Sequence, residues 1–121
     1  MSVFVLDASA WLRLFLDDGP WPEGLADAAM AVEARQDVFA APDAVLPEVA
    51  GALNRIERRG ALSATECDAS WRDMRRTPVA MIAVETWIEA ARTLARRESL
   101  TVFDGLYLAA AVRMAAPLLT A

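Results

Sequence analysis

Short apolar runs recur along the chain, each separated from the next by two helix-compatible segments, and this pattern constrains the fold more than any other feature. The runs are rich in β-forming residues and span 3–6, 38–41, 79–84 and 117–120. The segments between them predict helices over 8–16, 22–36, 47–59, 63–76, 85–97 and 101–115. Strands that alternate with helices are typical of a parallel sheet covered by helices. We therefore predict an α/β fold, an α/β/α sandwich around a central, mainly parallel sheet of four to five strands.

Turn and cap residues mark where several of these helices begin and end. Asp17-Asp18-Gly19-Pro20 is a turn sequence that ends the first helix, and Gly60 stands in a C-cap position after the third. Ser63-Ala64-Thr65-Glu66 has the capping-box pattern that opens a helix. Neither a linker, an internal repeat nor a low-complexity segment interrupts the 121 residues, so we expect a single domain over 1–121.

The first apolar run ends in an aspartate, Asp7, where the first helix is expected to begin. In open parallel sheets, ligands bind beyond the carboxyl ends of the strands, so a carboxylate at this place is a candidate site residue. A helix N-cap explains the same residue equally well. Asp and Ser are both favoured at that position, and either Asp7 or Ser9 could fill it.

A second carboxylate, Glu48, follows Pro47 in the first turn of the third predicted helix. It lies at the edge of the apolar stripe of that helix, which brings it near the expected core. The alternative is a solvated charged face. In that case the carboxylate favours the helix N-terminus and shares its side of the helix with Arg55, seven residues further on.

The third carboxylate, Asp104, stands in the first turn of the last predicted helix, where Thr101 and Asp104 have the spacing of a capping box. Its helical face continues through Leu108, Ala111 and Ala115, so we expect this carboxylate to point toward the core. A carboxylate in that position is costly unless it is paired or bound to a metal ion. Capping and metal binding can coexist, so the three acids together are candidate ligands for a divalent metal.

The composition limits the chemistry that such a site can carry out. The chain has no histidine, and all 12 basic residues are arginine, so histidine-based mechanisms and Cys/His zinc sites are excluded. The single cysteine, Cys67, allows no internal disulfide. A net charge of −5 argues against a protein that coats nucleic acid through general positive charge. It leaves room for an enzyme in which bound metal and a few local arginines face the substrate.

Several stretches, in order along the chain, resemble those of the PIN-domain ribonucleases, and in particular the VapC-like toxins of type II toxin–antitoxin systems. The most specific stretch is 102–111, followed by 116–120. Two shorter matches are Val5-Leu6-Asp7-Ala8-Ser9 and Pro47-Glu48-Val49. The likeness spans essentially the whole chain, and it implies a PIN-like version of the predicted sandwich.

The resemblance implies that Asp7, Glu48 and Asp104 are catalytic metal ligands and that Ser9 hydrogen-bonds beside them. The implied cofactor is Mg²⁺ or Mn²⁺, which prefers oxygen ligands and activates a water molecule to cleave an RNA phosphodiester. The implied products are a 3′-hydroxyl and a 5′-phosphate. The implied partners are an RNA substrate, an inhibitory cognate antitoxin and a second copy of the chain in a homodimer.

Members of that family usually place a fourth acid after the last strand, in a Thr-x-Asp pattern, and continue through a final helix and strand. The sequence ends at Thr120-Ala121, one residue before that acid is expected, so we expect the domain over 1–121 to lack the C-terminal helix and strand and to display three of the four acids. The richest apolar run, 106–112, is far shorter than the roughly 20 residues that cross a bilayer. We therefore expect no membrane association and a cytoplasmic location.

Two other interpretations remain open at this point. Receiver domains and aspartyl phosphatases also place aspartates at strand ends. Receivers typically require a lysine, which the chain lacks, and the phosphatase pattern requires a second aspartate at the position of Ser9. The second interpretation is a catalytically degenerate PIN-like domain that acts by binding another protein, with its carboxylates kept as helix caps.

Overall fold

The computed structural model describes all 121 residues and contains one sheet of four parallel strands. The strands lie in the order β3-β2-β1-β4 and span Val3–Leu6 (β1), Val38–Pro42 (β2), Val79–Ile82 (β3) and Leu118–Leu119 (β4). Each of the three neighbouring pairs is parallel. The predicted α/β fold is confirmed, with four strands rather than five.

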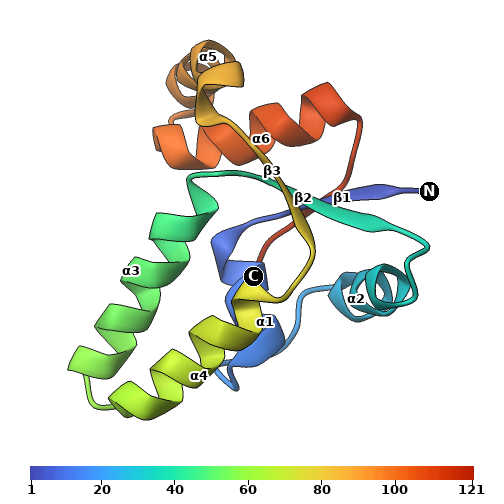
Figure 1. Cartoon of the computed structure of the whole chain (residues 1–121). Coiled ribbons are helices and arrows are strands. Elements are labelled where there is room, and N and C mark those ends of the chain that lie inside the picture. Colours follow the sequence, from blue (N-terminus) through green and yellow to red (C-terminus); the bar gives the residue numbers. More distant parts are fainter.

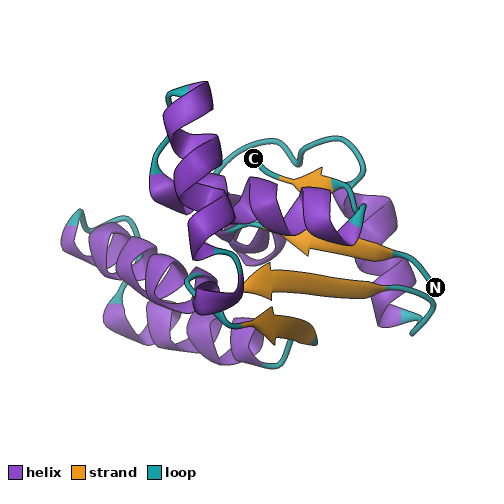
Figure 2. Ribbon diagram, turned by 90° about the horizontal axis from the view of Figure 1, so that it is seen from above, coloured by secondary structure: helices purple, strands orange, loops and turns teal.

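Six α-helices and one short 3₁₀ turn surround the sheet. They are α1 (Ala8–Phe15), α2 (Leu25–Glu33), α3 (Val45–Arg58), α4 (Ala64–Arg75), η1 (Val84–Thr86), α5 (Ile88–Glu98) and α6 (Val102–Met114). Helices α5 and α6 cover one face of the sheet, α1 and α2 lie across the other, and α3 and α4 project from it as a pair (Figure 1). All strands point toward the end of the sheet from which α3 and α4 extend (Figure 2).

Three helices have boundaries that differ from the prediction by more than one residue, each for a local reason. Helix α2 begins at residue 25, because Gly24 has a left-handed backbone (φ +85°) that interrupts a helical start at Pro22. Helix α3 begins two residues before Pro47, which lies in the first turn. Proline is tolerated there because backbone N–H groups in the first turn have no hydrogen-bond partner within the helix. The segment expected to open the fifth helix forms η1 instead, and α5 begins at Ile88.

The core lies on both faces of β1, which is a central strand between β2 and β4. Val5 and Leu6 are fully buried, and Trp11 of α1 is among the largest buried side chains. A strand with helices on both faces is buried on both sides, which explains why its sequence is continuously apolar rather than alternating. Asp7, at the end of this strand, is consequently held at the boundary between core and solvent.

Helices α5 and α6 approach each other closely at a glycine. A Cβ atom on Gly105 would lie 2.5 Å from the carbonyl oxygen of Ala91, so no side chain fits there. Ala91 is fully buried. This contact lies in the first turn of α6, next to Asp104, and it fixes the position of that turn.

The start of α4 has the predicted capping box. The backbone N–H of Glu66 donates to Ser63 Oγ (3.1 Å), and the backbone N–H of Ser63 donates to Glu66 Oε1 (3.0 Å). Cys67, in the same turn, is buried and unpaired. None of the helices is both long enough and apolar enough to span a membrane.

Candidate active site

Three segments that are distant in sequence meet at the carboxyl end of the sheet. Asp7 follows β1, Glu48 lies in the helix that follows β2, and Ala121 lies just beyond β4. The parallel pairing of β1 with β4 continues to this edge, where the backbone N–H of Asp7 donates to the carbonyl of Leu119 (3.1 Å). The site is thus a direct result of the sheet topology.

Asp7 is both a helix cap and a residue of this edge. Its Oδ1 atom accepts hydrogen bonds from the backbone N–H of Ala10 (2.9 Å) and from Ser9 Oγ (2.7 Å). The N-cap interpretation is therefore correct. Because both hydrogen bonds use Oδ1, the Oδ2 atom has no donor within the chain and remains available for another ligand.

Ser9 connects the Asp7 carboxylate to the end of β4. Its hydroxyl oxygen accepts from the backbone N–H of Ala121 (2.9 Å) while its proton is donated to Asp7. The Thr120 hydroxyl lies 3.4 Å away. Ser9 thus fixes the orientation of Asp7 and holds the segment after β4 at the same place.

Glu48 is half-buried in the first turn of α3, where its Oε1 atom accepts a 2.7 Å hydrogen bond from the Tyr107 hydroxyl. Burial raises the pKa of the Glu48 carboxyl, and the Tyr107 hydrogen bond opposes that rise. The carboxylates of Asp7 and Asp104 raise the pKa further, because like charges disfavour ionisation. Asp7 and Asp104 therefore both lie close enough to Glu48 to disfavour its ionisation.

Tyr107 is the residue of this site that the sequence did not reveal. It is buried in α6, one helical turn after Asp104, and burial raises the pKa of its hydroxyl, as does the neighbouring Glu48. A buried tyrosine hydroxyl needs a polar partner. The sequence feature that could have pointed to Tyr107 was its position three residues after Asp104.

Asp104 lies at the exposed rim of the site, so the prediction that it points into the core is wrong. Its backbone N–H donates to Thr101 Oγ1 (3.1 Å), as a cap at the start of α6 requires. The buried face of this helix is formed by other residues: Gly105, Leu106, Tyr107, Ala109 and Ala110. Small residues let α6 pack tightly against α5 and the sheet, and this packing rotates Asp104 toward solvent.

The carboxylates form an open acidic group rather than a closed ligand cluster. No three acidic, histidine or cysteine side chains lie in an arrangement that would by itself hold a metal ion. No basic side chain neutralises the group either. The ion pairs of the chain lie elsewhere, at Arg13–Asp18, Arg76–Asp73 and Arg97–Glu98. The predicted alternative for Glu48, a charged face shared with Arg55, is not accompanied by an ion pair.

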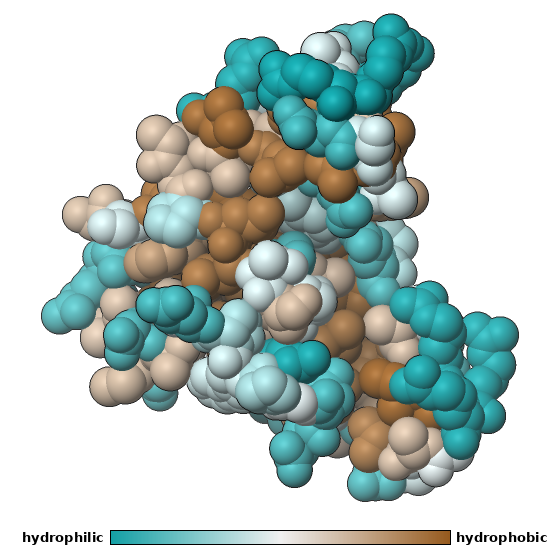
Figure 3. All heavy atoms as spheres, turned by 180° about the vertical axis from the view of Figure 1, so that it is seen from behind, coloured by the Kyte–Doolittle hydropathy of each residue, from teal (hydrophilic) through white to brown (hydrophobic).

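A pocket of about 390 Å³ opens beside the acidic group. It is lined by residues of α1, α3 and α6: Ala8, Ser9, Leu12, Pro47, Glu48, Ala52, Arg55 and Phe103. In the space-filling view, the molecule is indented between the upper lobe of α5 and α6 and the lower lobe of α3 and α4 (Figure 3). A ligand in the pocket would contact Glu48 and Ser9 together with neighbouring side chains of α1, α3 and α6.

The family model described as the PIN domain matches residues 4–121. The chain belongs to the PIN domain family. The match includes all three carboxylates, Ser9 and Tyr107, and it covers every strand except the first residue of β1. A comparison with curated protein sequences finds no significant match.

Solved structures share the fold of this PIN domain. PAE2754 from Pyrobaculum aerophilum aligns with a TM-score of 0.73 and 19% identity, over 98% of this chain and 74% of that one. VapBC2 from Rickettsia felis, bound to a promoter DNA fragment, aligns with a TM-score of 0.61 and 16% identity, over 96% and 85%. VapC20 from Mycobacterium tuberculosis, described as a toxin that cleaves the sarcin–ricin loop, aligns with a TM-score of 0.58 and 20% identity, over 95% and 85%.

Proposed function

We propose that this PIN domain is a metal-dependent endoribonuclease, with Asp7, Glu48 and Asp104 as its metal-binding and catalytic carboxylates. The observation that supports the proposal is that Asp7 and Asp104 lie close enough to Glu48 to raise its pKa, while none of the three forms an ion pair with a basic side chain. Mutual repulsion of this kind is relieved by a bound cation.

The donor set fits a hard divalent cation. Mg²⁺ and Mn²⁺ prefer carboxylate oxygens, and Mg²⁺ commonly retains several waters while one or two carboxylates bind it directly. An open acidic group meets that requirement. When bound, the ion supplies a more acidic water and a positive charge beside the phosphodiester.

The residues of the chain provide the orientation. Ser9 and the backbone N–H of Ala10 hold Asp7 through one oxygen and leave the other free. Tyr107 fixes the Glu48 carboxylate by its hydrogen bond and so reduces the cost of holding the ion in place. Asp104, exposed at the rim, faces incoming substrate and lies close enough to Glu48 to raise its pKa.

We further propose that the chain acts as the toxin of a toxin–antitoxin pair, that a cognate antitoxin inhibits it, and that it forms a homodimer. The support is the fold shared with VapC20, which is described as a toxin, and with VapBC2.

The test is cleavage of single-stranded RNA by the purified chain with Mg²⁺, with EDTA, and with an Asp7→Asn variant. Asparagine is as good an N-cap as aspartate, so the variant should fold normally while its cleavage falls by orders of magnitude. Asp27→Asn, on the exposed side of α2, is the matched control and should cleave like the unmodified chain. Equal cleavage by Asp7→Asn, or cleavage unaffected by EDTA, would contradict the proposal. Absence of both cleavage and Mn²⁺ binding would favour the degenerate, protein-binding PIN domain.

A further inference from the structure

Two side chains of the pocket are not explained by packing, capping or the acidic group. Arg55 comes from the last turn of α3 and Phe103 from the first turn of α6, and both line the pocket together with Ser9 and Glu48. One is a cation and the other an exposed aromatic ring. Neither is needed to hold the acidic residues in place.

Arg55 is exposed and has no acidic partner within 4.0 Å. Its Nη1 atom lies 3.4 Å from the place where a side chain on Gly51 would begin, so the guanidinium folds back along α3 toward its N-terminus. Glu48 lies in that direction but bonds Tyr107 instead. The guanidinium is therefore free to bind an anion that enters the pocket.

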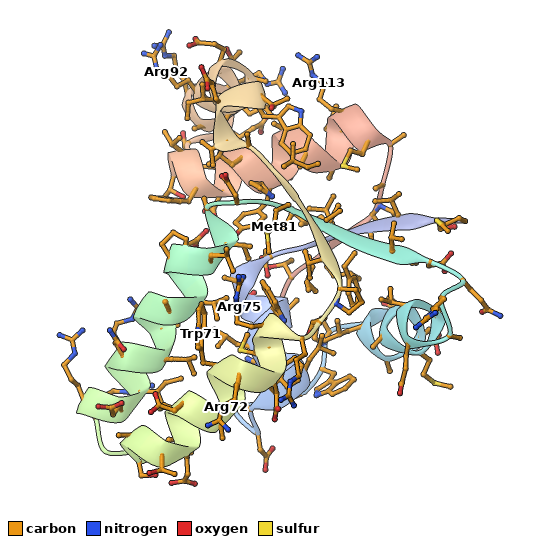
Figure 4. All side chains as sticks on the ribbon, in the orientation of Figure 1. Trp71, Arg72, Arg75, Met81, Arg92 and Arg113 are labelled. Carbon is orange, nitrogen blue, oxygen red and sulfur yellow. The ribbon has the colours of Figure 1, made fainter.

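Other arginines of the surface are placed differently. Arg75 stacks over the ring of Trp71, with its guanidinium carbon 5.8 Å from the ring centre. Arg92 and Arg113 point away from the α5–α6 layer into solvent, and Arg72 points outward from α4 (Figure 4). Among the residues that line the pocket beside the acidic group, Arg55 is the only basic one.

Phe103 is 53% exposed, although it is a large apolar residue in the first turn of α6. An exposed aromatic ring at the mouth of a pocket provides a stacking surface for an unpaired base. Small pocket residues, Ala8 and Ala52, leave room for a ligand between the ring and α3.

We propose that Arg55 and Phe103 form a two-point anchor for single-stranded RNA, with Arg55 binding a backbone phosphate and Phe103 stacking on a base. The inference rests on the proposed ribonuclease function. The net charge of the chain is negative and does not favour RNA binding. An acidic protein therefore needs local cations and stacking surfaces to hold a polyanion, and these two residues provide them. Between them, the two residues would hold the intervening phosphodiester against the carboxylates.

Binding measurements separate the two contacts. Fluorescence anisotropy with a fluorescein-labelled, single-stranded RNA of mixed sequence is recorded in Mg²⁺ over a series of KCl concentrations, in the Asp7→Asn background to prevent cleavage. Arg55→Gln should lower the slope of log affinity against log salt by about 0.7, the value for one lost phosphate contact on a single strand. Phe103→Leu should weaken binding by roughly tenfold without changing that slope.

Matched controls exclude general effects of charge or surface loss. Arg58→Gln removes a neighbouring exposed arginine of α3, and Trp21→Leu removes an exposed aromatic ring outside the pocket. Both should bind RNA like the parent. Arg55→Lys should keep the salt slope, and Phe103→Trp should keep the affinity. Thermal melts should be unchanged throughout, because the substituted side chains are exposed.

Two outcomes overturn the anchor. In the first, Arg55→Gln and Phe103→Leu bind RNA with the same affinity and the same salt slope as the two controls. The other is unchanged RNA affinity together with dissociation of an oligomer by Phe103→Leu in light scattering, which would assign the ring to contact between copies of the chain. Either result, combined with cleavage by the unmodified protein, leaves the ribonuclease function standing. If the unmodified protein failed to cleave RNA, both the ribonuclease function and the anchor would be ruled out.

Discussion

The Tyr107 hydroxyl donates a 2.7 Å hydrogen bond to Glu48 Oε1 and so connects α6 to α3 across 59 residues of sequence. The bond joins two of the three elements that carry the acidic group. It also opposes the pKa rise that burial and the neighbouring carboxylates impose on Glu48. Tyr107 therefore controls the charge of the site as well as its geometry.

Tyr107→Phe should shift the acidic limb of the pH–rate profile for RNA cleavage to higher pH. Loss of the hydroxyl removes the interaction that lowers the pKa of Glu48, while burial and like charges continue to raise it. Stability should fall by only about 1 kcal/mol, the net value of one hydrogen bond. Rates measured between acidic and neutral pH test this. Identical acidic limbs for the variant and the parent would show that Tyr107 is a packing residue alone.

Glu48→Gln should stabilise the metal-free protein at neutral pH while abolishing cleavage. Because the folded-state pKa of Glu48 is raised, ionising it costs stability as pH rises through that pKa. The gain in the variant should therefore vanish at pH values below the ordinary pKa of glutamate. Urea denaturation of both proteins at acidic and neutral pH measures it. If the variant were less stable than the parent at neutral pH, ionised Glu48 would stabilise the fold rather than destabilise it, and the prediction would be wrong.

Added Mg²⁺ should reverse the order of stability of the parent and the Glu48→Gln variant. A ligand that binds only the folded state raises its stability, and the parent keeps the carboxylate that the variant lacks. We expect thermal melting of the parent to rise with Mg²⁺ concentration and that of Glu48→Gln to rise less. Equal shifts would place the bound ion away from Glu48.

Gly105→Ala and Gly51→Ala should have opposite effects on stability, although both replace a helical glycine. At Gly105 the new Cβ would lie 2.5 Å from a backbone carbonyl of α5, so overpacking of about 1–3 kcal/mol should outweigh any gain in helix propensity. At Gly51 the nearest atom is the flexible end of Arg55 at 3.4 Å, and the propensity gain of up to about 1 kcal/mol should dominate. Chemical denaturation of both variants checks the signs. A stabilising Gly105→Ala would mean that α5 and α6 can separate at no cost.

The order of elements could be predicted from the sequence because it depends on local patterns. Each short apolar run became a strand, and the capping box at Ser63 formed as its residues predict. The predicted helix boundaries were less accurate at Gly24 and around Val84, because the local backbone conformation determines where the helix begins at these places.

The site was only partly predictable, because side-chain direction depends on how whole helices pack. Asp7 and Ser9 follow from the strand end and the helix start that the sequence displays. The exposure of Asp104 depends on which face of α6 meets α5, and three apolar residues on one side were not enough to decide it. The partner of Tyr107 lies 59 residues away, at a distance that no local pattern can reveal.

Ser9→Ala should loosen the end of β4 and reduce cleavage without removing the cap of α1. The Ser9 hydroxyl accepts from the backbone N–H of Ala121 and donates to Asp7, whereas the Ala10 bond that caps the helix is independent of it. Hydrogen exchange at the Ala121 amide should quicken, and global stability should fall by about 0.5–1.5 kcal/mol. Ser9→Thr retains a hydroxyl and is the matched control. Unchanged exchange at residue 121 in the alanine variant, with cleavage intact, would show that Ser9 neither holds this segment nor orients Asp7.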